Sequence, residues 1–194
     1  MRPVPTGPSR DFSPALIAAI HGIAESRDLE TALDAVLSSA VQTLGPTVAA
    51  VLVQDPDRPG LQPLASFGFD DAAVSRLADD TADPANPFAE AAVNRTATFD
   101  REATMPDGSP FVGAYLPLTV SSGGVELVVG AIGLGWPSPR TLEAPEREIL
   151  TALASLASVA VDRARLASTA AERSDWFERM AHTDALTGLA NERT

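Results

Sequence analysis

The sequence predicts an α+β fold, in which a central antiparallel β-sheet carries the terminal helices on one face. Apolar residues recur at helical spacing near both ends of the chain, whereas the middle holds short apolar runs rich in β-branched residues. The order is helices, strands with short helices, a strand hairpin and a long helix. Because helices and strands do not alternate one for one, we expect an antiparallel sheet. The 194 residues, 45% of them hydrophobic, suffice for one domain and an extension.

The N-terminal part is expected to hold a disordered segment and two helices. Residues 1–12 contain three prolines and a glycine, and we expect them to be disordered. Ser13 places a capping hydroxyl before Pro14, which predicts the start of a helix. A second helix follows Asp28, its predicted cap, and ends at Gly45-Pro46.

Two strands are expected after these helices. Residues 47–54 form an apolar, β-branched run, which predicts a strand buried on both faces. A turn rich in proline and aspartate follows. Residues 61–67 then form a second strand, so these two strands are predicted to pair as a hairpin.

The middle of the chain predicts shorter elements. Short helices are expected at residues 70–77 and 87–93, separated by an acidic, loop-like segment at residues 79–86. A short strand is expected at residues 96–99.

The final hairpin and helix carry strong local signals. Strands are predicted at residues 111–120 and 125–135, joined by the turn sequence Ser-Ser-Gly-Gly. No proline or glycine interrupts the chain between Pro145 and Gly188. A continuous helix over residues 145–182 would be about 57 Å long at 1.5 Å per residue. One small domain cannot cover a helix of that length.

Composition narrows the classes of function. The chain has 26 acidic and 14 basic residues and a net charge of -12, so a nucleic-acid partner is not expected. The absence of cysteine removes disulfides, thiolate metal ligands and a cysteine nucleophile, and no metal site is predicted. No apolar run approaches the roughly 20 residues of a membrane span, and no secretory signal precedes the domain. We therefore expect a cytoplasmic protein with no membrane span in this fragment.

The predicted order of elements and four motifs resemble the GAF domain family. The strand Ala114–Val120, the strand Val129–Leu134, the helix start Leu142–Glu146 and the apolar helix Leu150–Ala157 follow the family's order. The likeness covers residues 13–167. It implies a sensory domain with short helices over a ligand cavity.

A second resemblance concerns the C-terminal end. Residues 184–191 read Asp-Ala-Leu-Thr-Gly-Leu-Ala-Asn and resemble the motif that opens the GGDEF domains of diguanylate cyclases. The matching junction residues are Asp184, Leu186, Thr187, Gly188, Leu189 and Asn191. Glu192-Arg193 stands where Arg-Arg is common in that family. The resemblance implies that residues 184–194 begin a truncated catalytic domain, and that GTP and Mg belong only to its missing part.

The long helix carries a candidate seam for a second copy of the chain. Two-stranded coiled coils need apolar residues at alternating spacings of three and four. Arg163 and Arg173 interrupt this pattern, so a solvated amphipathic helix is the alternative. We expect a homodimer through the terminal helices, with residues 168–183 as a coiled-coil signalling helix and a seam formed by Leu156, Val159, Leu166, Ala170, Phe177 and Met180.

The GAF resemblance places a candidate ligand cavity among the aromatic residues of the middle segments. Aromatic walls suit a flat small molecule, although ordinary core packing is the alternative. Binding of a cyclic nucleotide is disfavoured because the chain has no lysine. Binding of haem is disfavoured because His21 and His182 lie away from the expected cavity. The candidate residues are Phe67, Phe88, Phe99, Phe111, Tyr115 and Arg101.

These observations predict a sensory and regulatory fragment of a diguanylate cyclase. The domain would dimerise and relay a small-molecule or partner signal through its last helix to the missing GGDEF domain. A ligand-free GAF scaffold for dimerisation is the alternative. An independent enzyme is not expected, because the spacing suggests no nucleophile, base and metal constellation, and this fragment is expected to have no catalytic residue or cofactor.

Overall fold

The computed structural model describes residues 12–55, 57–104 and 109–182, and only the backbone of residues 172 and 175–182. Its five strands form one antiparallel sheet in the order β2-β1-β5-β4-β3. The predicted α+β fold and both predicted hairpins are confirmed. The elements are α1 (Ser13–Glu25), α2 (Leu29–Leu44), β1 (Val48–Gln54), β2 (Leu61–Phe67), α3 (Asp71–Asp80), α4 (Pro87–Asn94), β3 (Thr98–Thr104), β4 (Pro110–Ser122), β5 (Val125–Pro137) and α5 (Ala144–His182).

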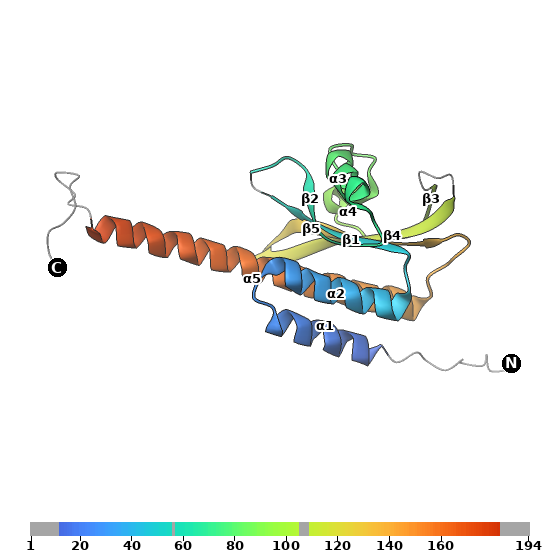
Figure 1. The fold of residues 1–194 in the computed structure, drawn as a ribbon, viewed down its shortest axis with the longest axis horizontal. Helices are drawn as coiled ribbons and strands as arrows, with labels where there is room; N and C mark the ends of the chain where they lie inside the picture. The colour runs from blue at the N-terminus through green and yellow to red at the C-terminus, as the bar shows by residue number, and fades with distance from the viewer. Residues whose placement is uncertain (1–11, 56, 105–108, 183–194) are drawn as a thin grey trace.

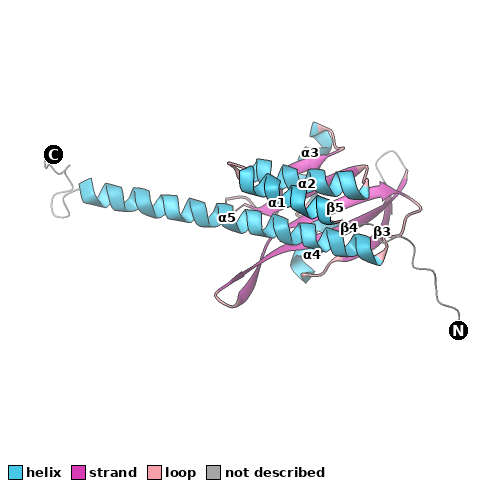
Figure 2. Cartoon of the chain, turned by 90° about the horizontal axis from the view of Figure 1, so that it is seen from below, coloured by secondary structure: helices cyan, strands magenta, loops and turns pink. Residues whose placement is uncertain are grey.

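The helices cover the two faces of the sheet unequally. Helices α2 and α5 pack on one face, and α1 lies outside them, mainly against α2 and α5 (Figures 1 and 2). Helices α3 and α4 lie over the opposite face. The terminal helices therefore share one face, as the sequence predicts, and the two short helices enclose the other.

The ends of the first two helices follow from local signals, with one correction. Asp28 caps α2, because its Oδ1 accepts a hydrogen bond of 2.8 Å from the backbone N–H of Thr31. The same bond lowers the pKa of Asp28. Gly45 ends α2 in the left-handed conformation, with φ 62°. The expectation that Ser13 caps α1 is wrong: Phe12 holds the N-cap position, and Ser13 is already helical.

The middle segments differ from the predicted boundaries. Helix α3 continues through Asp80, into the segment expected to be a loop, and ends where Thr81 closes the last turn. Strand β3 covers Thr98–Thr104 instead of residues 96–99. Its extent is set by pairing with β4, which is a non-local contact that local pattern does not encode.

The main core lies between the sheet and helices α2 and α5. Leu33, Leu116, Ile132 and Leu153 are fully buried there, and each such side chain contributes about 1.5–3 kcal/mol by burial. Trp136 joins this core at the end of β5, where its Nε1 donates a 2.9 Å hydrogen bond to the carbonyl of Leu44. A smaller cluster occupies the face under α3 and α4.

Helix α5 is held along its first half and continues beyond the sheet. Glu146 is buried at its start and accepts hydrogen bonds from Glu143 N and Arg140 Nη2, at 3.1 and 2.9 Å. Ser158 Oγ accepts a 3.0 Å bond from Thr119 N, next to an irregularity in the pairing of β4. After Val161 no described residue of α5 is buried, and the helix projects away from the domain (Figure 1). Among the described residues, no helix is both long and apolar enough to cross a membrane.

Candidate functional site

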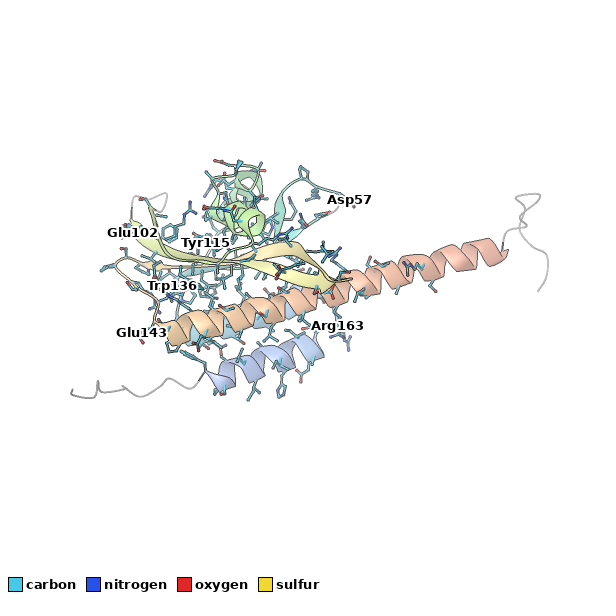
Figure 3. All side chains as sticks on the ribbon, turned by 180° about the vertical axis from the view of Figure 1, so that it is seen from behind. Asp57, Glu102, Tyr115, Trp136, Glu143 and Arg163 are labelled. Carbon is cyan, nitrogen blue, oxygen red and sulfur yellow. The ribbon has the colours of Figure 1, made fainter. Side chains whose placement is uncertain are left out.

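A cavity of about 130 Å³ lies between the sheet and the short helices. Strands β1, β4 and β5 supply its floor, and helices α3 and α4 with the segments before them supply its walls. Tyr115 lies on this side of the sheet, below α4 (Figure 3). The residues that line the cavity are Val48, Ala49, Phe69, Leu77, Asn86, Pro87, Phe88, Phe111, Tyr115, Gly133, Leu134 and Gly135.

Glycines on β4 and β5 make room for the aromatic rings. Gly133 pairs with Tyr115 across the two strands, and Gly135 pairs with Gly113. A Cβ on Gly133 would lie 2.5 Å from the Phe88 ring and 2.9 Å from the Tyr115 ring. A Cβ on Gly113 would lie 2.6 Å from Tyr115 Oη. Backbone thus forms the surface under these rings, and any side chain at either glycine would displace them.

Tyr115 and Phe88 form the centre of the aromatic wall. Their ring centroids are 5.1 Å apart at an interplanar angle of 77°, an edge-to-face pair. Tyr115 is 6% exposed, and burial raises the pKa of its hydroxyl to about 12. The hydroxyl is therefore protonated at neutral pH and can donate a hydrogen bond.

Only three of the six candidate ligand residues line this cavity, namely Phe88, Phe111 and Tyr115. Phe67 ends strand β2 and is 44% exposed, outside the lining. Phe99 packs against the main core and under the guanidinium of Arg147, 5.3 Å from its ring centroid. Arg101 also lies outside the lining and forms an ion pair with Glu90 on α4.

The bulge in β3 explains where Phe99 and Arg101 lie. The pairing with β4 shifts between Thr98 and Arg101, and Asp100 has a positive φ of 56°. Such a shift changes the face to which the following side chains belong. Alternation along the sequence cannot predict it, because the extra residue is visible only in the pairing.

Several lining residues were not among the candidates. Phe69, Leu77 and Asn86 come from the segments that the short helices bring over the sheet. Gly133 and Gly135 carried a usable signal, since glycines two residues apart in a strand share one face. Both glycines lie within β5, in the strand that the sequence predicts at residues 125–135.

The candidate seam has mixed surroundings. Leu156 is half-buried against the domain's own core, whereas Val159 and Leu166 are 60% and 64% exposed. Ala170 is also exposed.

The neighbouring helix α1 adds to this surface. Ile17 and Ile20 are exposed apolar residues on α1, which packs beside α5. Arg163 is exposed and donates a 3.4 Å hydrogen bond to the carbonyl of Ile23. The side chains of Phe177 and Met180 lie outside the described residues.

The remaining sequence predictions concern the domain junction, the two histidines and metal binding. The junction residues Asp184, Leu186, Thr187, Gly188, Leu189 and Asn191 lie outside the described part of the chain. His21 is exposed on α1, and the side chain of His182 is not described. Within residues 12–55, 57–104 and 109–182, no group of histidine and acidic side chains is arranged to hold a metal ion.

Comparisons with known proteins agree with this architecture. A sequence model of the GAF domain matches residues 26–162, whereas no curated protein sequence matches the chain. The GAF domain of a phosphoenolpyruvate-protein phosphotransferase from Coxiella burnetii superposes with a TM-score of 0.67 and 12% identity, over 81% of this chain and 96% of that one.

Two further similar structures were determined with small molecules. A free methionine-R-sulfoxide reductase from Neisseria meningitidis, in complex with its substrate, has a TM-score of 0.60 and 13% identity, over 80% of this chain and 91% of that one. The phycocyanobilin-bound GAF domain of a cyanobacterial phytochrome has a TM-score of 0.54 and 13% identity, over 81% of this chain and 97% of that one. At these identities the likeness concerns the fold.

Proposed function

The chain belongs to the GAF domain family, and from this premise we propose that it is the sensory domain of a cyclic di-GMP signalling protein. GAF domains are generally sensory or regulatory domains of signalling proteins. In this proposal a small molecule or partner acts on the domain, and α5 relays the change to a GGDEF domain that begins at Asp184. That catalytic domain would use GTP and Mg, and the residues before it would catalyse nothing.

The course of α5 is the observation that carries this proposal. The helix packs on the sheet as far as Val161 and then continues to His182, beyond the rest of the domain (Figure 1). The sequence Asp-Ala-Leu-Thr-Gly-Leu-Ala-Asn follows within two residues of its end. An exposed extension directly before a motif that resembles the opening of a GGDEF domain is suited to connect the two domains.

We further propose that a second copy of the chain covers the exposed apolar residues of α1 and α5. Val159 and Leu166 are seven residues apart and therefore lie on the same side of the helix. Ile17 and Ile20 extend this apolar surface on the neighbouring helix. Parallel pairing of two α5 helices would bring the two GGDEF domains together, which diguanylate cyclase chemistry on two GTP molecules needs.

One observation favours the alternative of a ligand-free scaffold. Cavities for drug-sized ligands measure about 300–1,000 Å³, whereas this cavity measures about 130 Å³. Two similar structures nevertheless hold small molecules in this fold. Native mass spectrometry of the protein purified from its own host separates the alternatives: a retained small molecule supports the sensor, and its consistent absence supports the scaffold.

The test of the relay uses the protein extended through the domain that begins at Asp184. Leu166→Glu should convert the dimer into a monomer in analytical ultracentrifugation and reduce the formation of cyclic di-GMP from GTP. Arg165→Glu is the matched control, because it places the same side chain one position along α5, rotated by about 100°. Sedimentation and turnover that respond alike to both substitutions would contradict the proposed seam.

A further inference from the structure

Tyr115 is the lining residue that brings a hydroxyl to the cavity. The side chain is more than nine-tenths buried, and it lines the cavity. Among the described residues, its hydroxyl makes no hydrogen bond. Because this hydroxyl can donate a hydrogen bond, an acceptor supplied by a bound molecule would complete this site.

The shape of the cavity limits the molecule to about one ring. Aromatic rings of Phe69, Phe88 and Phe111 stand around a surface of glycine backbone. An apolar cavity on the order of 150 Å³ holds a benzene molecule, and this cavity measures about 130 Å³. Because this cavity is slightly smaller, a single ring with one short substituent is its upper limit, and a nucleotide or a tetrapyrrole exceeds it.

The lining also selects against charge. None of the described residues that line the cavity carries a charged side chain. The nearby guanidinium of Arg101 is bound by Glu90 and lies 3.4 Å from the carbonyl of Ala85. A charged ligand would lose its hydration without gaining a partner of opposite charge, and that loss costs several kcal/mol.

We propose that the cavity binds a small, uncharged, single-ring compound that presents a carbonyl or similar hydrogen-bond acceptor to Tyr115. This inference rests on the proposed sensory function and names the chemical class of its signal. Tyr115 is then the residue that determines specificity for the acceptor, and the glycine backbone and phenylalanine rings recognise the flat apolar part.

Three probes of similar shape test the proposal by titration calorimetry on the 194-residue chain. Acetophenone supplies a ring and a carbonyl, ethylbenzene a ring alone, and benzoate a ring with a negative charge. We expect acetophenone to bind, and to bind at least tenfold more tightly than benzoate. Tyr115→Phe should weaken acetophenone about threefold to tenfold, the effect of one neutral hydrogen bond, and leave ethylbenzene unchanged.

Phe67→Leu is the matched control, because it alters an exposed aromatic side chain outside the lining. It should leave all three affinities unchanged, and circular dichroism should show that both variants are folded. The proposal is overturned if benzoate binds more tightly than acetophenone, if Tyr115→Phe leaves the affinity for acetophenone unchanged, or if none of the probes binds. A charged or larger molecule retained in native mass spectrometry overturns the ligand class and leaves the sensory role standing.

Discussion

Asp100 and Arg101 are neighbours in sequence, yet their side chains bind helices on opposite faces of the sheet. Asp100 Oδ2 lies 2.5 Å from Arg147 Nη2 on α5, and Asp100 Oδ1 accepts a 2.8 Å hydrogen bond from Leu142 N. Arg101 pairs with Glu90 on α4, the helix that covers the cavity. The bulge in β3 therefore joins the start of the long helix to the cover of the cavity.

Removal of the Asp100 carboxylate should destabilise the domain. Asp100→Ala loses both bonds at the start of α5, which should lower the free energy of unfolding by about 1–3 kcal/mol. It should lose roughly 1 kcal/mol more because alanine tolerates the positive φ of this position poorly. Asp100→Asn should cost less, since asparagine adopts this conformation readily. Glu102→Ala, at an exposed position of the same strand (Figure 3), should change the free energy of unfolding in urea by less than about 0.5 kcal/mol. Equal losses for Asp100→Ala and Glu102→Ala would contradict this role.

A methyl group at Gly133 should disturb the aromatic wall. The Cβ of Gly133→Ala would lie 2.5 Å from the Phe88 ring, so we expect a loss of about 1–3 kcal/mol in the free energy of unfolding from overpacking. Adding Phe88→Leu shortens the side chain that the methyl meets. A double-mutant cycle should therefore show that this second change recovers part of the loss. Strictly additive losses would mean that the two residues do not press on one another.

The titration of Tyr115 should depend strongly on folding. Tyr115 is the one tyrosine of the chain, so the absorbance of its phenolate reports on this site alone. In the folded domain, burial raises its pKa from the ordinary value of 10.0 to about 12. Because folding raises the pKa, the linked stability is complete below about pH 10 and is lost as the pH rises towards 12. A midpoint near pH 10 in protein that circular dichroism shows to be folded would contradict the burial of this hydroxyl.

Thr81 should be essential for holding α3 to the sheet. Its buried Oγ1 accepts a 3.1 Å hydrogen bond from Leu61 N and lies 2.8 Å from the carbonyl of Ala78. Thr81→Val keeps the shape but leaves a buried N–H without a partner, which costs about 1–3 kcal/mol. Thr81→Ser retains the hydroxyl and should cost less, as measured by urea unfolding. If serine proves as damaging as valine, packing of the methyl group outweighs the hydrogen bonds.

Local signals allowed the helices of the main core to be predicted, whereas β3 needed information from elsewhere in the chain. Helix α2 has Asp28 at one end and Gly45 at the other, and both act through bonds within a few residues. Strand β3 takes its limits from β4, and Phe99 takes its face from the bulge beside it. A shift of one residue moves a side chain to the other face of a sheet.

The candidate site was predicted in part for the same reason. Phe111 and Tyr115 alternate on a strand with a clear pattern, so their shared face could be expected. Phe69 and Leu77 reach the cavity through the packing of α3 over the sheet, which no local pattern fixes. The glycine floor was not among the predicted site residues, because the space there depends on residues that have no side chain.

The position of β4 between the cavity and α5 sets how far a signal would have to travel in the proposed relay. Tyr115 faces the cavity, and Leu116, the next residue, packs in the core with α5. Further along the strand, the backbone of Thr119 is bonded directly to Ser158 of that helix. A displacement of the strand backbone moves both surfaces together, because consecutive residues share one peptide plane. In the proposed relay, stimulus and response would thus be separated by the thickness of a single sheet.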